Sequence, residues 1–308
     1  MQEEAPMTRV ARTGGRTLRA TLLAGLLGVC VGLAPAAISA ATSATPAAVD
    51  QALRDAIAGP QRSSDHKKRD DERHPRQTLE FFGIRPDMRV EEFLPEGGWY
   101  TEILAPFLHD HGKLVEAAFP TTSSNSFLRG MARRYRHKLA ADSSVYGRVS
   151  IRPISPPDYM PLGPPASQDM ILTFRNLHDL VYANAHHEAW GGGLRRFFRS
   201  AYRALVPGGV VGVVAHRANP GANVGKSAVK GRLPQAYVVA QARHAGFRLA
   251  ASSDINANPR DDRTKPVWYF TPSLKAPKDQ RAKYRAMGAA DNMTLRFVKP
   301  ADSADAAG

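Results

Sequence analysis

The chain has 308 residues, of which 43% are apolar and 23% charged, and its formal net charge at pH 7 is +14. These are the proportions of an ordinary globular protein, long enough to bury a sizeable core without a scaffold of disulfides. Its single cysteine, Cys30, lies in a segment that we expect to be removed. The mature chain should therefore have no disulfide, no thiolate nucleophile and no cysteine metal site.

Residues 1–40 have the pattern of a secretory signal peptide. Basic residues from Arg9 to Arg19 precede an apolar run from Thr21 to Leu33, and Ile38-Ser39-Ala40 resembles a signal-peptidase site. The apolar run is too short and too rich in glycine for a comfortable membrane span, and no later segment reaches spanning length. The sequence predicts a periplasmic or secreted bacterial protein without a transmembrane segment after cleavage. A retained anchor, or lipidation at Cys30, is the alternative.

Removal of residues 1–40 takes away four arginines and two glutamates and leaves a net charge of +12. Such a charge favours an anionic partner, such as a polymer or a membrane surface, or simply a solvated basic surface. The positive residues are spread along the whole chain, and the densest runs, 66–69 and 133–138, lie in no RNA-binding motif with interleaved aromatics. We predict no specific nucleic-acid partner.

The remaining chain is expected to have three parts: a polar and helical N-terminal extension (41–76), a core domain (77–300) and a disordered tail (301–308). Apolar periodicity predicts helices over 49–57, 77–82, 100–107, 125–140, 194–205 and 235–245. It predicts strands over 89–94, 113–118, 147–151, 169–174, 210–215, 247–252, 267–270 and 293–298. The repeated alternation of strand and helix indicates an α/β fold with a doubly wound, mostly parallel sheet.

Candidate ligand-binding residues follow the predicted strands, because such sheets bind ligands beyond the carboxyl ends of their strands. After the first strand, the turn from Pro95 to Tyr100 contains Gly97 and Gly98, which allow backbone to approach a ligand beside a helix N-terminus. Glycine pairs are also common in ordinary turns, so this signal alone is weak.

The strand 169–174 runs directly into Arg175, Asn176 and His178, which can form hydrogen bonds at the ligand edge of the sheet. The alternative is that Asn176 and Asp179 only cap the next helix.

The strand 210–215 is followed by His216 and Arg217, which again face the expected crevice. His216 titrates near neutrality and is a candidate general base, although a lone histidine is more often structural. The run His186-His187-Glu188 contains metal-binding residue types, but adjacent histidines point to different sides of a regular element. We predict no metal site.

Taken in order, the segments GIRPDMRVEEFLPEGGWYTEIL, DMILTFRNLHDL and RALVPGGVVGVVAHR resemble the motifs of class I S-adenosylmethionine-dependent methyltransferases. AGFRLAASSDI and MTLRFVKP resemble the closing strands of that class. More narrowly, the chain resembles a family of predicted, often exported, bacterial methyltransferases. It shares with that family the sequence motifs GGWYTEILAP, LTFRN-H, INANP and MTLRFVKP. The resemblance covers roughly residues 70 to 300.

The resemblance implies a Rossmann-like sheet of seven strands with helices on both faces, and S-adenosyl-L-methionine as cofactor. The loop from Pro95 to Tyr100 would wrap the methionine and ribose parts of the cofactor, with Glu92 at the acidic position that ends the first strand. The implied cofactor-binding residues are Glu92, Pro95, Glu96, Gly97, Gly98, Trp99, Tyr100, Arg175, Asn176 and His178. His216 and Arg217 would lie where the substrate meets the methyl group, as candidate catalytic residues.

The chain departs from the wider class at two places. Leu94 and Glu96 stand where the class has glycines in its first loop, and Ala118 stands where an acid would bind the ribose, with Glu116 two residues earlier. The leading hypothesis is a methyltransferase acting on a small molecule. The departures favour the alternative, a non-catalytic periplasmic ligand-binding protein on the same fold.

Overall fold

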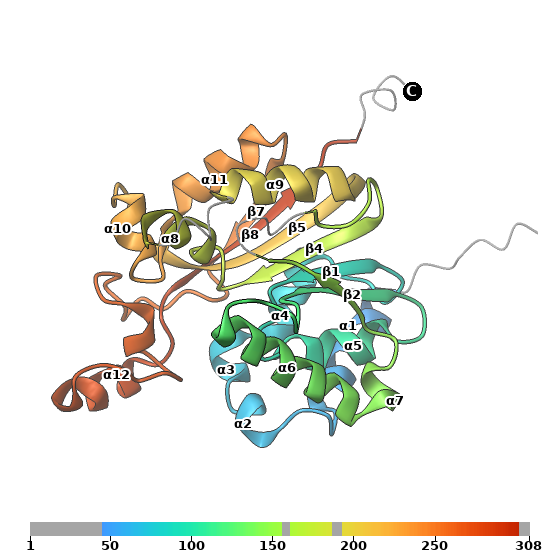
Figure 1. The fold of residues 1–308 in the computed structure, drawn as a ribbon, viewed down its shortest axis with the longest axis horizontal. Helices are drawn as coiled ribbons and strands as arrows, with labels where there is room; N and C mark the ends of the chain where they lie inside the picture. The colour runs from blue at the N-terminus through green and yellow to red at the C-terminus, as the bar shows by residue number, and fades with distance from the viewer. Residues whose placement is uncertain (1–44, 156–160, 187–192, 302–308) are drawn as a thin grey trace, which may run out of the picture. The chain divides into compact units, whose positions relative to one another are not determined.

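A continuous seven-stranded sheet runs through the part of the chain that the computed structural model describes, residues 45–155, 161–186 and 193–301 (Figure 1). The strands are β1 (Arg89–Phe93), β2 (Lys113–Ala118), β3 (Ser150–Pro153), β4 (Gln168–Phe174), β5 (Leu205–Ala218), β7 (Arg248–Ser253) and β8 (Asn292–Val298). Their order is β3-β2-β1-β4-β5-β8-β7, and a two-residue strand, β6 (Leu233–Pro234), pairs with the end of β5. β8 is antiparallel to both its neighbours, while the other pairs are parallel. The predicted mostly parallel α/β sheet is confirmed.

Helices cover both faces of the sheet. α9 and α11 lie on one face, and α1, α4 and α5 lie on the other (Figure 1). The helices are α1 (Pro46–Ala58), α2 (Ser64–Lys67), α3 (Asp70–Arg73), α4 (Pro75–Phe82), α5 (Thr101–Leu108), α6 (Ser126–Ala141), α7 (Ser143–Tyr146), α8 (Asp179–His186), α9 (Gly193–Ala204), α10 (Val224–Ala228), α11 (Gln235–His244) and α12 (Arg281–Met287). Within the described ranges, none of them is both long and apolar enough to cross a membrane.

The apolar pattern explains this layering. In α9, the stripe Leu194, Phe197, Phe198 and Ala201 is buried against the sheet, as expected for residues three and four positions apart. In β4, consecutive residues from Met170 to Leu172 are all fully buried, because a strand covered on both faces has no solvent side.

The largest differences between the predicted and the observed elements lie at residues 267–270 and at the start of β5. The predicted strand at 267–270 is wrong: Val267–Tyr269 forms a 3₁₀ turn, and its side chains pack on Phe270 and Tyr284 instead of joining the sheet. The predicted strand 210–215 is longer at its start: β5 begins at Leu205 and includes Pro207-Gly208-Gly209, where the register against β4 shifts. β5 begins immediately after α9, so this irregular stretch takes the place of a separate loop.

The predicted N-terminal extension belongs to the same compact unit as the sheet, as far as it is described. Leu53 of α1 is fully buried in the core that α4 and α5 share. The short helices α2 and α3 then continue beside the loop after β1. There Trp99 lies between two guanidinium groups of the extension, with the Cζ atoms of Arg62 and Arg73 at 4.8 and 4.6 Å from its ring centre.

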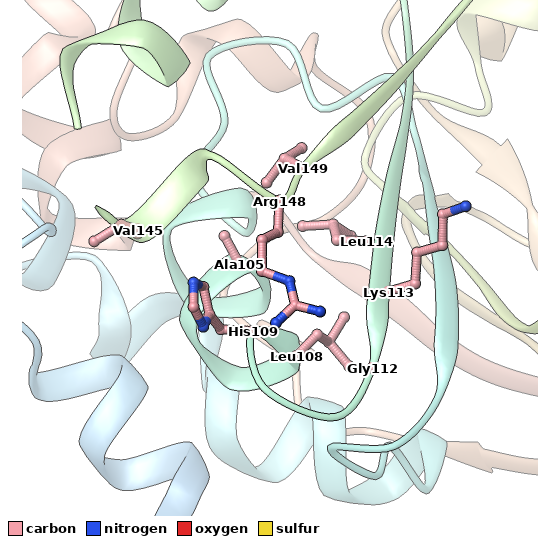
Figure 2. Close-up of a pocket in the computed structure, with 9 residues that line it drawn as sticks. All are labelled: Ala105, Leu108, His109, Gly112, Lys113, Leu114, Val145, Arg148 and Val149. Carbon is pink, nitrogen blue, oxygen red and sulfur yellow. The ribbon is translucent and has the colours of Figure 1, made fainter. Parts of the chain in front are cut away.

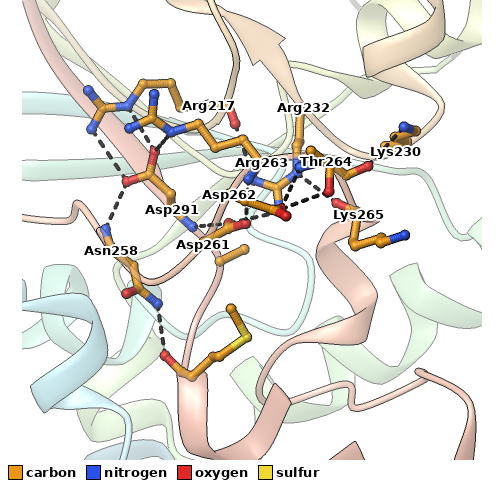
Figure 3. A network of polar contacts seen from close by, with 12 residues as sticks. Arg217, Lys230, Arg232, Asn258, Asp261, Asp262, Arg263, Thr264, Lys265 and Asp291 are labelled. Atoms are coloured by element: carbon orange, nitrogen blue, oxygen red, sulfur yellow. Dashed lines mark hydrogen bonds and ion pairs between the residues drawn. The ribbon is translucent and has the colours of Figure 1, made fainter. Parts of the chain in front are cut away.

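A buried ionic network joins the segment before β8 to the end of β5 (Figure 3). Arg232 Nη2 lies 2.8 Å from Asp261 Oδ2, and both side chains are 0% exposed. Asp291 accepts from Arg217 Nε at 3.0 Å and forms an ion pair with Arg263 Nε at 2.8 Å. Because Asp261 also accepts from the backbone N–H of Asp291 at 2.7 Å, the two halves form one continuous cluster.

The predicted signal peptide at 1–40, the residues His187 and Glu188 of the metal-like run, and residues 302–308 of the predicted tail lie outside the described residues.

Candidate functional site

The loop after β1 has an unusual backbone. Leu94, Glu96 and Gly98 have φ values of +54°, +51° and +72°, in the left-handed region that glycine adopts without strain. The methyltransferase resemblance places glycines at positions 94 and 96, so the chain keeps a glycine-like path with bulkier residues. Such strained positions concentrate at functional sites, where the surrounding structure holds them in place.

Two side chains from other elements hold this loop. Lys138 of α6 donates through Nζ to the carbonyl oxygens of Gly97 and Gly98, at 2.9 and 3.2 Å. Asn176 donates through Nδ2 to the carbonyl oxygens of Phe93 and Leu94, at 2.7 and 3.1 Å. These bonds connect the loop to α6 and to the end of β4, and they give Asn176 a positioning role.

A hollow of about 250 Å³ opens between this loop, the end of β4 and the extension; we call it the β1 hollow. Its described lining consists of His66, Arg69, Arg73, Glu92, Leu94, Pro95, Glu96, Gly97, Trp99, Tyr100, Phe174 and Arg175. It therefore brings together the predicted residues Glu92, Pro95, Glu96, Gly97, Trp99, Tyr100 and Arg175. Among the other predicted residues, Gly98, Asn176, His178, His216 and Arg217 lie outside this lining.

The end of β4 forms a rigid wall of the hollow. The ring of Phe174 stacks on the ring of Tyr100, with centres 3.5 Å apart and an angle of 9° between the planes. Arg175 follows with φ of +67°, a second strained position facing the first across the hollow. The guanidinium nitrogens Nη1 and Nη2 of Arg175 are withdrawn from solvent and have no hydrogen-bond partner in the described part of the chain.

The extension supplies the residues that sequence reasoning missed. His66 of α2 and Arg73 of α3 reach the hollow, together with Arg69 between the two helices. His66 Nδ1 lies 2.8 Å from Glu102 Oε2, and Trp99 Nε1 donates to the His66 carbonyl at 3.2 Å. The only signal in the sequence was the dense basic run at 66–69, which indicates charge and not a position beside β1.

A buried pair of carboxyl groups lies behind the loop. Glu92 of β1 and Glu116 of β2 are register partners on adjacent strands, and both are buried. Thr101 Oγ1 donates to Glu92 Oε2 at 3.3 Å and lies 3.0 Å from the hydroxyl of Tyr135, while Glu116 has no partner for either oxygen among the described residues. Burial raises the pKa of Glu92 and of Glu116, and the neighbouring carboxyl group raises that of Glu116 further.

The position beyond β2 is nearly closed. Next to Ala118, a depression of only about 10 Å³ remains, and the apolar side chains Phe119, Met131 and Ala132 border it together with Tyr135. Glu116 is 0% exposed, so its carboxyl group cannot reach a ligand at this edge.

The predicted catalytic residues lie at the same edge of the sheet, at the end of β5. The rings of His216 and His178 have centres 6.2 Å apart. Burial and the charge of Arg175 lower the pKa of His216 well below its usual value, so its imidazole is neutral at pH 7. Arg217 is held by Asp291 and by the carbonyl of Asn292 at 2.9 Å, outside the lining of the β1 hollow, and its catalytic role stays a prediction.

A separate hollow of about 300 Å³ lies at the amino end of β2, between Leu108, Lys113 and Arg148 (Figure 2). Parallel strands place their amino ends at the edge opposite the loops after β1 and β4. This second hollow is therefore not part of the candidate site.

The fold is similar to solved methyltransferase structures. Geranyl diphosphate C-methyltransferase from Streptomyces coelicolor A3(2), solved with Mg²⁺, geranyl diphosphate and S-adenosyl-L-homocysteine, is 14% identical, with a TM-score of 0.50 over 80% of this chain and 88% of that chain. A putative sarcosine dimethylglycine methyltransferase from Galdieria sulphuraria is 12% identical, with a TM-score of 0.50 over 76% of this chain and 85% of that chain. No family model and no curated sequence matches the chain. The chain thus has the Rossmann-like fold of class I methyltransferases.

Proposed function

We propose that the protein is an S-adenosyl-L-methionine-dependent methyltransferase that acts on a small-molecule acceptor. The observation that carries the proposal is the meeting of two strained segments, Leu94–Gly98 and Arg175, around one hollow at the carboxyl ends of β1 and β4. The Streptomyces enzyme of the same fold was solved in complex with S-adenosyl-L-homocysteine, and this supports the choice of cofactor.

The residues around the β1 hollow fit the methionine part of that cofactor better than its adenosine part. The β1 hollow offers open space at Gly97, where an added Cβ would meet no described atom within 4 Å, and buried donors without partners on Arg175. These features suit the methionine part, which carries a carboxylate. On the adenosine side, α6 closes the depression beside Ala118, and the buried Glu116 does not line it; among the described lining residues the carboxylate is that of Glu96, from the loop after β1.

When bound, the cofactor supplies an activated methyl group for an in-line displacement, so the protein mainly positions donor and acceptor. We propose that the loop from Pro95 to Tyr100 and Arg175 hold the donor. The neutral imidazole of His216 offers a nitrogen that can accept a proton from the acceptor, since its lowered pKa leaves it unprotonated at pH 7.

Gly97→Leu is expected to weaken S-adenosylmethionine binding at least tenfold while leaving the melting temperature near that of the wild type. The new side chain extends from the wall of the β1 hollow into open space, and Gly97 does not need a positive φ. Calorimetric titration with S-adenosylmethionine and with S-adenosylhomocysteine measures the effect. The matched control is Gly225→Ala in α10, where the added Cβ would make only an ordinary contact of 3.6 Å with Asn223 Oδ1 and which lies away from the hollow.

Saturable micromolar binding to the wild type supports the proposal, and no binding of either nucleoside contradicts it. In that case the second candidate function stands, a non-catalytic ligand-binding protein on the same fold. The specific observation in its favour is the depression beside Ala118, which is closed by Met131 and Tyr135 and leaves about 10 Å³.

We also propose that the acceptor is met outside the cytoplasm, because residues 1–40 have the pattern of a cleavable signal peptide. N-terminal sequencing of the protein from a periplasmic fraction tests this: an intact N-terminus in the cytoplasmic fraction alone would contradict export.

A further inference from the structure

Three arginines from two distant parts of the chain meet at the β1 hollow. Arg69 and Arg73 come from the extension around α3, and Arg175 follows β4. Arg69 Nε, Arg73 Nε and both terminal nitrogens of Arg175 are shielded from solvent and have no hydrogen-bond partner among the described residues. Buried polar groups are rarely left in this state unless a ligand or an ordered water completes them.

The cluster is unfavourable as it stands. Burial lowers the pKa of all three arginines, and the charge of Arg175 lowers those of Arg69 and Arg73 further. Like charges that are held together away from water destabilise the folded protein unless an opposite charge lies between them.

The carboxylates around the cluster do not supply that charge. Glu72 Oε1 accepts from Thr271 Oγ1 at 2.6 Å, and Glu92 Oε2 accepts from Thr101 Oγ1. Glu96 belongs to the strained loop, and its charge acts on Arg73 only from beyond ion-pair distance, while burial of its carboxyl group raises its pKa to about 7. Within the described ranges, no carboxylate oxygen comes within 4.0 Å of a guanidinium nitrogen of the three arginines, although closer pairs such as Arg62 with Asp70 occur nearby.

Neighbouring groups also fix the positions of the arginines before any ligand binds. The guanidinium of Arg73 lies over the ring of Trp99, which also contacts Arg62 and Tyr100, and Trp99 Nε1 donates to the His66 carbonyl. Arg175 has its backbone fixed in a strained conformation directly after β4. Planar guanidinium groups arranged in this way match the geometry of carboxylate and phosphate oxygens.

We infer that the β1 hollow binds the anionic group of the small-molecule acceptor, a carboxylate or a phosphate, through Arg69 and Arg73 of the extension, while Arg175 across the hollow holds the carboxylate of the donor. The assignment of the anion to the methyl acceptor rests on the proposed function, whereas the binding of an anion by the arginines does not. The extension would then serve as the part of the protein that selects a negatively charged substrate.

Inorganic phosphate is the probe, titrated calorimetrically into the full-length mature protein at pH 7 and low ionic strength. The wild type is expected to bind it saturably with a Kd in the millimolar range or below. The double variant Arg69→Gln/Arg73→Gln is expected to bind roughly 10- to 100-fold more weakly, because two charge-assisted contacts are lost. Its melting temperature without phosphate should equal or exceed that of the wild type, since repulsion within the cluster is relieved.

The matched control is Arg54→Gln/Arg85→Gln, which removes the same charge from exposed positions outside the hollow and should leave phosphate binding unchanged. Arg69→Gln alone provides a second test if the double variant fails to fold. Absence of saturable binding to the wild type, or equal binding by variant and wild type, would overturn the inference.

Repeating the titration with saturating S-adenosylhomocysteine separates this inference from the proposed function. Phosphate binding that persists supports an acceptor site beside the cofactor. Phosphate binding that is lost competitively assigns the arginines to the cofactor's own carboxylate and overturns the acceptor assignment. If S-adenosylhomocysteine does not bind but phosphate does, the anion site stands and the methyltransferase proposal fails.

Discussion

Asp261→Ala is expected to lower the free energy of unfolding by about 3–5 kcal/mol, because it leaves a buried guanidinium without its counter-charge. Asp261 and Arg232 are both 0% exposed and lie 2.8 Å apart, and Asp261 also accepts from the backbone N–H groups of Asp291 and Arg263 (Figure 3). Urea unfolding followed by circular dichroism measures the loss. For a unit of this size, it corresponds to a fall in Tm of roughly 10 °C.

The adjacent Asp262 provides the control. It is exposed and accepts from the backbone and hydroxyl of Thr264, so Asp262→Ala is expected to cost less than about 1 kcal/mol. The double variant Arg232→Met/Asp261→Leu should be less destabilised than the sum of its single variants, because no unpaired charge stays buried. Equal losses of unfolding free energy for Asp261→Ala and Asp262→Ala would show that the buried ionic network does not stabilise the protein more than an exposed carboxylate does.

Glu116→Gln is expected to make the protein more stable at pH 8 and to flatten the dependence of stability on pH, because the buried amide has no proton to lose in the unfolded state. Burial raises the pKa of both Glu92 and Glu116 in the folded protein, Glu92 to about 7 from 4.5. The folded state therefore holds protons that the unfolded state releases. The stability of the wild type should be greatest below pH 4.5, as far as this pair is concerned, and should fall as the pH rises towards 7 and above.

Urea unfolding at pH 5, 6.5 and 8 measures the slope for wild type and variant. Asp279→Asn, which removes a carboxyl group at an exposed position, should keep the wild-type slope. A variant that loses stability with pH as steeply as the wild type would rule out the carboxyl pair as the cause.

Apolar periodicity was enough to predict most of the sheet and the helices that cover it. The predicted strand at 113–118 coincides with β2, and the predicted helix at 194–205 differs from α9 by one residue at each end. In both cases burial follows the period of the element, so local pattern and tertiary contact agree. For the segment 267–270 the apolar pattern gave a wrong prediction, because local pattern and tertiary contact disagree there. It is as apolar as a strand, but its neighbours in space are Tyr284 and Ala276 and not a strand edge.

The sequence predicted only those residues of the candidate site that directly follow a strand in the chain. The residues from Pro95 to Tyr100 and Arg175 follow directly from the rule that ligands bind after the strands of a parallel sheet. The role of Asn176 depends on contacts with Phe93 and Leu94, 83 and 82 residues earlier in the chain, which no local pattern reports. The same holds for Arg69 and Arg73, whose place at the hollow depends on how the extension packs against Trp99.

The position of β8 has a consequence for synthesis. β7 joins the described sheet only through β8, and β8, at residues 292–298, follows both β5 and β7 in the chain. Until these residues have been synthesised, the edge of β5 from Val210 to His216 lacks its antiparallel partner, and β7 has no partner in the described sheet. A nascent chain that lacks β8 should thus expose two unpaired strand edges, and it should be prone to aggregation until β8 is added.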